Sequence, residues 1–131
     1  MRLLVVDDSN SVWERLLDML GRRPEEIDLC HARSLQAARK CLGIFHPNWV
    51  VLDADLPDGT GLDLLPELRG QGFATHVAVF TNHPEYRLRS LELGADSFFD
   101  KSMDFLDLVA MLRQHASVQP PICEPTREPR P

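Results

Sequence analysis

The chain has 131 residues, of which 44% are hydrophobic and 26% charged, a composition typical of one globular domain large enough to bury a core. Its formal net charge of −6 argues against direct binding to nucleic acid, because that requires clustered lysine and arginine side chains. No apolar stretch reaches the roughly 18 to 20 residues that span a bilayer, and charge follows the first apolar run too soon for a signal peptide. We therefore expect a cytoplasmic protein without membrane insertion.

The first half of the chain alternates apolar runs with helical patterns. The continuous apolar run at 3–6 predicts a strand buried on both faces. Polar capping residues at 9–11 begin a helical pattern that Gly21 and Pro24 end. The elements expected next are a strand at 27–31, a helix capped by Ser34 and a strand at 49–52.

The second half repeats this alternation. Turn residues at 56–61 precede a helix that Gly70 and Gly72 stop. The remaining predicted elements are a strand at 76–80, a helix with Pro84 in its first turn, a strand at 97–99 and a helix from Phe105 to Leu112. Five strand–helix units, (βα)5, predict an α/β fold with a doubly wound five-stranded parallel sheet in the flavodoxin-like strand order 2-1-3-4-5.

The composition changes near the carboxyl end. Residues 117–131 contain five of the ten prolines of the chain, which predicts a disordered or polyproline-like tail after a domain at 1–116. The three cysteines, Cys30, Cys41 and Cys123, form no Cys-x-x-Cys pair. We expect reduced thiols, with Cys30 and Cys41 packed as small hydrophobic side chains.

Charged residues stand at the ends of three predicted strands. Asp7 and Asp8 follow the first strand, Asp53 follows the third, and Lys101 follows the fifth. In an open parallel sheet with this strand order, the carboxyl ends of the first and third strands border one crevice. Carboxylates gathered there resist joint ionisation unless a cation lies between them. Mg²⁺ is the natural candidate, since it prefers carboxylate oxygens and bridges to phosphate.

The same edge of the sheet holds the groups needed for phosphoryl transfer. Asp53 stands alone at a central strand end, so it is the predicted nucleophile that forms an aspartyl phosphate. The Thr81 hydroxyl and the Lys101 ammonium follow the fourth and fifth strands, where they are expected to stabilise phosphoryl oxygens. An alternative interpretation makes Asp7 and Asp8 a helix-capping pair and Lys101 a surface lysine.

Four motifs, in order, resemble the receiver domain of two-component response regulators over about residues 2–115. The motifs are Val5-Val6-Asp7-Asp8-Ser9, the stretch from Leu52 to Leu62, Val79-Phe80-Thr81 and the stretch from Gly94 to Lys101. The resemblance implies Asp53 as the phospho-acceptor. It also implies that Asp7, Asp8, Asp53 and the backbone carbonyl of Asp55 bind Mg²⁺, that Thr81 and Lys101 bind the phosphoryl group, and that Phe98 takes the place of the family's switch aromatic.

The chain departs from the family pattern at several positions. Phe98 replaces a frequent tyrosine, Asn82 a small residue, and Ser102 the proline that usually follows the lysine. Without proline, a cis bond after Lys101 is disfavoured by about 2.5 to 4 kcal/mol. Asp55, Asn82 and His83 are expected to modulate access to the acyl phosphate and the rate of its hydrolysis.

The resemblance implies a single-domain, chemotaxis-type receiver rather than an enzyme with an external substrate. A histidine kinase or histidine phosphotransfer protein is the expected donor, and an unidentified downstream protein is expected to bind the surface of the fourth helix, fifth strand and fifth helix. Homodimerisation is left open. Two other functions also remain open: a phosphatase similar to haloacid dehalogenases, whose Asp-x-Asp motif this chain lacks after its first strand, and a constitutive interaction module.

Overall fold

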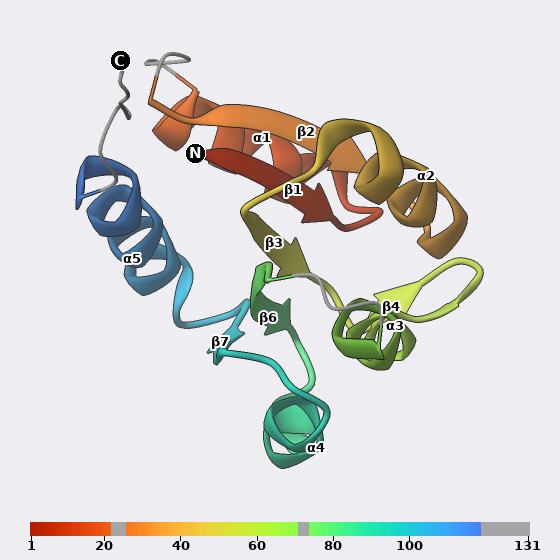
Figure 1. Ribbon diagram of the computed structural model, residues 1–131. Helices are drawn as coiled ribbons and strands as arrows, with labels where there is room; N and C mark the ends of the chain where they lie inside the picture. The colour runs from red at the N-terminus through yellow and green to blue at the C-terminus, as the bar shows by residue number, and fades with distance from the viewer. Residues whose placement is uncertain (22–25, 71–73, 119–131) are drawn as a thin grey trace.

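The computed structural model describes residues 1–21, 26–70 and 74–118 of the chain. Five long strands alternate with helices (Figure 1). The strands are β1 (Arg2–Val6), β2 (Asp28–Ala32), β3 (Trp49–Leu52), β4 (Asp55–Leu56), β5 (Gly59–Thr60), β6 (His76–Thr81) and β7 (Ser97–Asp100). The α-helices are α1 (Asn10–Leu20), α2 (Leu35–Phe45), α3 (Leu64–Gly70), α4 (Arg87–Glu92) and α5 (Phe105–Val118), with 3₁₀ turns η1 (Gly61–Asp63) and η2 (Pro84–Tyr86).

The main sheet is parallel and has the strand order β2-β1-β3-β6-β7. Counting only these five strands, the order is 2-1-3-4-5, so the predicted flavodoxin-like topology is confirmed. The predicted strand ends agree with the observed ones to within one residue. The register pairs Val6 with Leu52 across β1 and β3, and Leu52 with Val79 across β3 and β6. This register brings the carboxyl ends of the three central strands to one edge.

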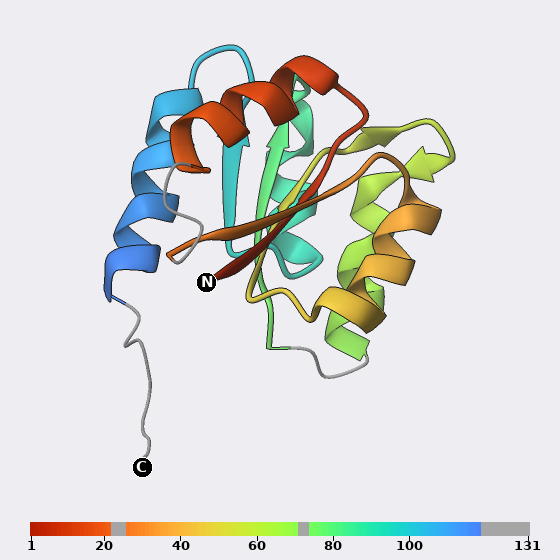
Figure 2. The same ribbon diagram turned by 90° about the horizontal axis from the view of Figure 1, so that it is seen from above.

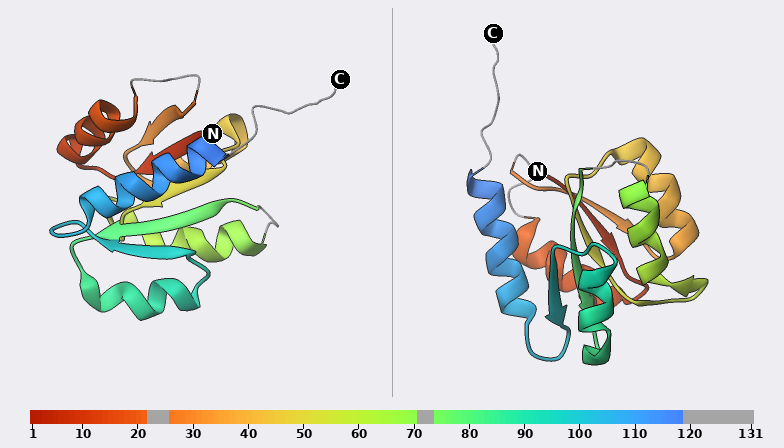
Figure 3. Two further views of the ribbon diagram at one scale, coloured as in Figure 1. Left: turned by 90° about the vertical axis from the view of Figure 1, so that its left-hand side faces the viewer. Right: turned by 60° about the horizontal axis from the view of Figure 1, so that its bottom comes forward.

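Helices cover both faces of the sheet (Figure 2). One core packs α1 and α5 against residues such as Val5, Val51 and Phe80, all almost fully buried. The other packs α2 and α3 against alternate strand residues such as Val6 and Leu52. In Figure 3, left, α5 crosses in front of the strands. The central strands β1, β3 and β6 are thus buried on both faces, as their continuous apolar runs predict.

Side-chain caps fix where the first helices begin. The Ser9 hydroxyl accepts a hydrogen bond from Val12 N at 3.4 Å, and the Ser34 hydroxyl accepts one from Ala37 N at 3.1 Å. These are the capping positions that the sequence predicts. The α2 helix ends where His46 takes a left-handed conformation with φ of 51°.

The structure departs from the expected elements in three places. The turn predicted at 56–61 belongs to the short antiparallel hairpin of β4 and β5 and to η1, which precedes α3. The helix predicted to hold Pro84 in its first turn is preceded by the 3₁₀ turn η2, which contains Pro84, and α4 begins only at Arg87. The α5 helix continues to Val118, past the predicted Leu112. Pro24, Gly72 and the tail from 119 onward lie outside the described residues.

Two further expectations concern the peptide bond after Lys101 and the absence of a membrane-spanning segment. The described residues contain no cis peptide bond, so the bond between Lys101 and Ser102 is trans, as expected without proline. Within the described ranges, no helix combines the length and the apolar character that a membrane span requires.

Gly61 is the point where the hairpin returns to the sheet. Its amide donates to the Ala54 carbonyl at 2.8 Å, and a Cβ at this position would lie 1.8 Å from the Asp53 carbonyl oxygen. Only glycine therefore allows the hairpin to pass this close to the strand end.

We expect Gly61→Ala to lower the free energy of unfolding by about 1–3 kcal/mol, because the hairpin or the Asp53 backbone must move. Urea denaturation measures this loss. Gly43→Ala is the matched control: apart from the adjacent residues and the nearby backbone of α2, no atom lies within 4 Å of its Cβ position, so it should stabilise by about 0.5–1 kcal/mol. Equal effects of the two substitutions would contradict the steric argument.

Candidate functional site

The predicted site residues come together at the carboxyl edge of the sheet. Backbone pairing continues one residue past the strands: Asp7 N donates to Ala32 O at 3.0 Å, Asp53 N to Val6 O at 2.9 Å, and Lys101 N to Thr81 O at 2.9 Å. Residues distant in sequence are therefore held at fixed positions by the sheet itself. Asp7 and Asp53 are 1% and 5% exposed, and Thr81 is fully buried.

Lys101 joins the two buried carboxylates. Its Nζ lies 2.7 Å from Asp7 Oδ2 and 3.0 Å from Asp53 Oδ2. The lysine side chain is itself only 11% exposed. The interpretation of Lys101 as a surface lysine is therefore wrong, because its ammonium lies between two carboxylates that are shielded from water.

The acidic residues fit a hard divalent cation. Asp7, Asp8 and Asp53 each offer a carboxylate oxygen, and these oxygens lie within 4.8 Å of one another. Within the described part of the chain, buried Asp7 Oδ2 accepts no hydrogen bond of good geometry, although it contacts the lysine. Asp8 is exposed. A set of oxygen ligands with one side open to water is what Mg²⁺ prefers, since it retains several waters.

Burial and neighbouring charge shift both key pKa values. Loss of hydration, together with repulsion from Asp7, raises the pKa of Asp53 above its ordinary value, although Lys101 opposes the shift. For Lys101, burial alone lowers the pKa, but the contacts with Asp7 and Asp53 outweigh it and the pKa is raised. The lysine is therefore a permanent cation, whereas Asp53 ionises less readily until another cation approaches.

A cleft of about 540 Å³ opens above these groups. It is lined by residues from four strand ends and the hairpin, among them Asp8, Asp53, Asp55, Thr81, Asn82, His83 and Lys101. Asp7 and Phe98 are not among its lining residues. Seven of the predicted site residues, Asp8 included, thus face one cleft.

The comparison with protein-family models adds a decisive match. Residues 3–113 match the model described as the response regulator receiver domain. The chain belongs to this receiver family. The strand order, the acidic cluster and the lysine between Asp7 and Asp53 agree with that membership.

Curated relatives and a solved structure give the extent of the likeness. The two-component response regulator PhoP of Pseudomonas aeruginosa is 31% identical over 86% of this chain and 50% of its own length. The transcriptional regulatory protein CutR of Streptomyces coelicolor is 32% identical over 95% of this chain and 59% of its own length. The BeF₃-activated N-terminal receiver domain of Klebsiella pneumoniae RstA superposes with a TM-score of 0.77 at 26% identity, covering 88% of this chain and 98% of that one. The receiver chain spans about half the length of the curated relatives it matches.

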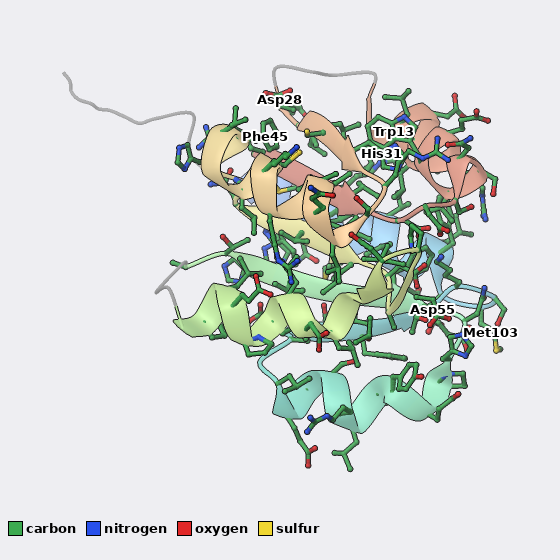
Figure 4. The ribbon with its side chains drawn as sticks, turned by 90° about the vertical axis from the view of Figure 1, so that its right-hand side faces the viewer. Trp13, Asp28, His31, Phe45, Asp55 and Met103 are labelled. Atoms are coloured by element: carbon green, nitrogen blue, oxygen red, sulfur yellow. The ribbon has the colours of Figure 1, made fainter. Side chains whose placement is uncertain are left out.

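Two residues that line this receiver's cleft, Asp55 and His83, contact each other. His83 Nε2 contacts the Asp55 carboxylate, and His83 Nδ1 lies 3.5 Å from Glu85 Oε2. Asp55 is 62% exposed (Figure 4), and Asn82 beside it is exposed as well. The sequence singled out Asp55 and His83 separately. Their contact is new, because it depends on how the hairpin approaches the end of β6.

Thr81 and Phe98 lie on neighbouring strands. Phe98 on β7 pairs with Val79 on β6, two residues before Thr81, so the three side chains share one face of the sheet. The Phe98 ring is half-buried against the core of that face, with the Arg87 guanidinium 6.0 Å from its centroid. The Thr81 hydroxyl accepts a hydrogen bond from His83 N at 3.4 Å.

Two supporting residues were missed by the sequence analysis. His31 Nε2 donates to the Asp7 carbonyl at 2.7 Å while its ring stacks on Trp13 at 4.7 Å between centroids (Figure 4). Asp58, in the hairpin, accepts hydrogen bonds from Leu35 N at 2.8 Å and Gln36 N at 3.0 Å. The Pro57-Asp58-Gly59 triplet signals a turn, but no local signal shows that its carboxylate caps α2.

The raised pKa of Asp53 gives the metal-free receiver a defined pH dependence. Because the folded state binds this proton more tightly than the unfolded chain, ionisation of Asp53 costs stability. That cost is absent below the ordinary value of 3.8 and appears as pH rises through the folded pKa. In EDTA at neutral pH, Asp53→Asn should therefore be more stable than wild type, and the difference should shrink toward about pH 4.

Urea unfolding of both proteins between about pH 4 and pH 8 measures this difference. Asp28→Asn is the control: Asp28 is exposed at the amino end of β2, opposite the site (Figure 4), and should follow the wild-type profile. Parallel pH profiles for wild type and Asp53→Asn would contradict the claim that ionisation of Asp53 destabilises the folded state.

Proposed function

We propose that this receiver accepts a phosphoryl group on Asp53 and passes the signal on through protein contact. The observation that carries the proposal is the Lys101 ammonium, 2.7 Å from Asp7 Oδ2 and 3.0 Å from Asp53 Oδ2, below an open cleft. A carboxylate beside a permanent cation and a cluster of oxygen ligands is suited to phosphoryl transfer, where catalysis rests on positioning and charge stabilisation.

Each residue has a distinct task in the proposed transfer. The Asp53 carboxylate attacks the phosphorus of a phosphohistidine donor, and the bond from phosphorus to the histidine nitrogen breaks. The Lys101 ammonium and the Thr81 hydroxyl donate hydrogen bonds to phosphoryl oxygens. Asp7, Asp8, Asp53 and the Asp55 backbone carbonyl would hold Mg²⁺. When bound, Mg²⁺ neutralises the carboxylates and stabilises the charge that develops on the phosphoryl oxygens.

The donor in this proposal is a histidine kinase or a histidine phosphotransfer protein. The receiver catalyses only its own phosphorylation and dephosphorylation, because Asp53 is both the nucleophile and the group that is modified.

The proposed output is a population shift. A phosphoryl group that engages the Thr81 hydroxyl withdraws it from His83 N and favours an arrangement in which the Phe98 ring turns further inward. The surface that responds consists of α4, β7 and α5. It already exposes apolar side chains: Leu88 is 69%, Leu91 39% and Leu106 69% exposed. These are suited to contact with a downstream protein.

Acetyl phosphate with MgCl₂ tests the proposal through the intact mass of the protein. Wild type should gain one phosphoryl group, because Asp53 displaces acetate from phosphorus, and EDTA should prevent the gain. Asp53→Asn should gain none, while Asp28→Asn should behave like wild type. Release of inorganic phosphate without any retained mass would instead favour a phosphatase. No gain and no phosphate release would favour a constitutive interaction module.

The Asp55–His83 pair should lengthen the life of the phosphorylated form. Because both of its residues line the cleft, it restricts the approach of water to the acyl phosphate. His83→Ala and Asp55→Asn should each shorten the phosphate lifetime severalfold, measured by loss of mass after removal of acetyl phosphate. Glu85→Gln, which breaks only the outer contact of His83, is the control and should change the lifetime little. Unchanged lifetimes in both pair variants would contradict this role.

A further inference from the structure

Two cysteines from different elements touch beside the edge strand. Cys30 lies on β2 and Cys41 on α2, and their sulfur atoms are 3.8 Å apart. Both side chains are partly exposed, and both pack against the core between α2 and the sheet. The expectation of small packed side chains is thus confirmed. The direct contact between the two thiols is an additional property that spacing alone does not show.

We propose that Cys30 and Cys41 form a disulfide under peroxide and are an oxidation site of this receiver. Sulfur atoms in a disulfide are about 2.05 Å apart, so the two atoms must approach by less than 2 Å from van der Waals contact. Rotation about the two Cα–Cβ bonds supplies a movement of this size. Because β2 is the edge of the sheet and both thiols are partly exposed, a small oxidant can reach them.

The reaction needs a hydroperoxide as oxidant and proceeds in two steps. The Cys41 thiolate attacks one peroxide oxygen, which gives a sulfenic acid and releases hydroxide. The Cys30 sulfur then attacks the Cys41 sulfur, so that the S–S bond forms while the hydroxyl and the Cys30 proton leave as water. Burial and the neighbouring thiol raise the pKa of Cys30 to about 11, so Cys30 supplies little thiolate near neutral pH and is assigned the second step.

The bridge would enclose the segment that supports the carboxyl edge of the sheet. Between the two cysteines lie His31, which donates to the Asp7 carbonyl, and the Leu35 and Gln36 amides, which donate to Asp58 in the hairpin. A covalent link between β2 and α2 restricts this segment from both ends. Oxidation is therefore expected to reduce local opening at these amides and to stabilise the folded chain.

Peptide mapping of the full chain after treatment with hydrogen peroxide tests the proposal directly. Catalase ends the reaction, iodoacetamide blocks the remaining thiols, and trypsin cuts after Arg33 and Lys40, which separates the two cysteines. We expect one cross-linked peptide pair that contains Cys30 and Cys41, with the loss of two hydrogen atoms. Dithiothreitol should reverse it. The midpoint of thermal unfolding should rise by about 5–10 °C on oxidation.

Variants separate this bridge from other oxidation. Cys123→Ser should still form the cross-link, whereas Cys41→Ser should not form it and should show no rise in the unfolding midpoint. Hydrogen exchange at the Leu35 and Gln36 amides should slow only in proteins that form the bridge. Links between chains alone, or conversion of each cysteine to its sulfinic acid without a link, would overturn the proposal in wild type itself. A bridge that leaves both amides and the unfolding midpoint unchanged would confirm the oxidation site but contradict the expected restriction of the segment between the two cysteines.

Discussion

The ammonium of Lys101, between Asp7 and Asp53, is the interaction on which the carboxyl edge of this sheet depends. Two carboxylates about 4 Å apart repel by about 4 kcal/mol at an effective dielectric constant of 20, and both are almost fully buried here. The lysine does not fully offset the loss of hydration and that repulsion, since burial first and Asp7 second still raise the pKa of Asp53. The site therefore still favours additional positive charge, which is the physical basis of the proposed metal binding and phosphoryl transfer.

The parallel sheet fixes the positions of these charged groups by holding three strand ends in register. Backbone hydrogen bonds continue past β1, β3 and β7 to Asp7, Asp53 and Lys101, so the charged groups sit on a rigid frame rather than on loops. The close return of Gly61 above Asp53 and the cap that Asp58 places on α2 attach the hairpin to the same frame. Positioning to within a fraction of an ångström is what phosphoryl transfer requires.

Local patterns in the sequence were sufficient for the sheet and for the charged groups at its edge. Buried parallel strands have continuous apolar runs and helix starts have polar caps, so the strands, Ser9 and Ser34 were predictable. The contacts of Asp55 with His83, of Asp58 with α2 and of Cys30 with Cys41 were not. Each joins elements whose approach depends on packing and loop conformation, and neither residue of a pair carries a local signal for the other.

The groups of the site lie far apart along the chain, so the pocket forms only in completely folded molecules. Lys101 and Asp53, joined by a 3.0 Å hydrogen bond, are separated by 48 residues in sequence, and Asp7 joins them from the first strand. No fragment or partly folded copy brings these three groups together, because each comes from a different strand of one sheet. In the proposed function, a misfolded copy therefore has no assembled pocket with which to accept a phosphoryl group, and only intact molecules respond.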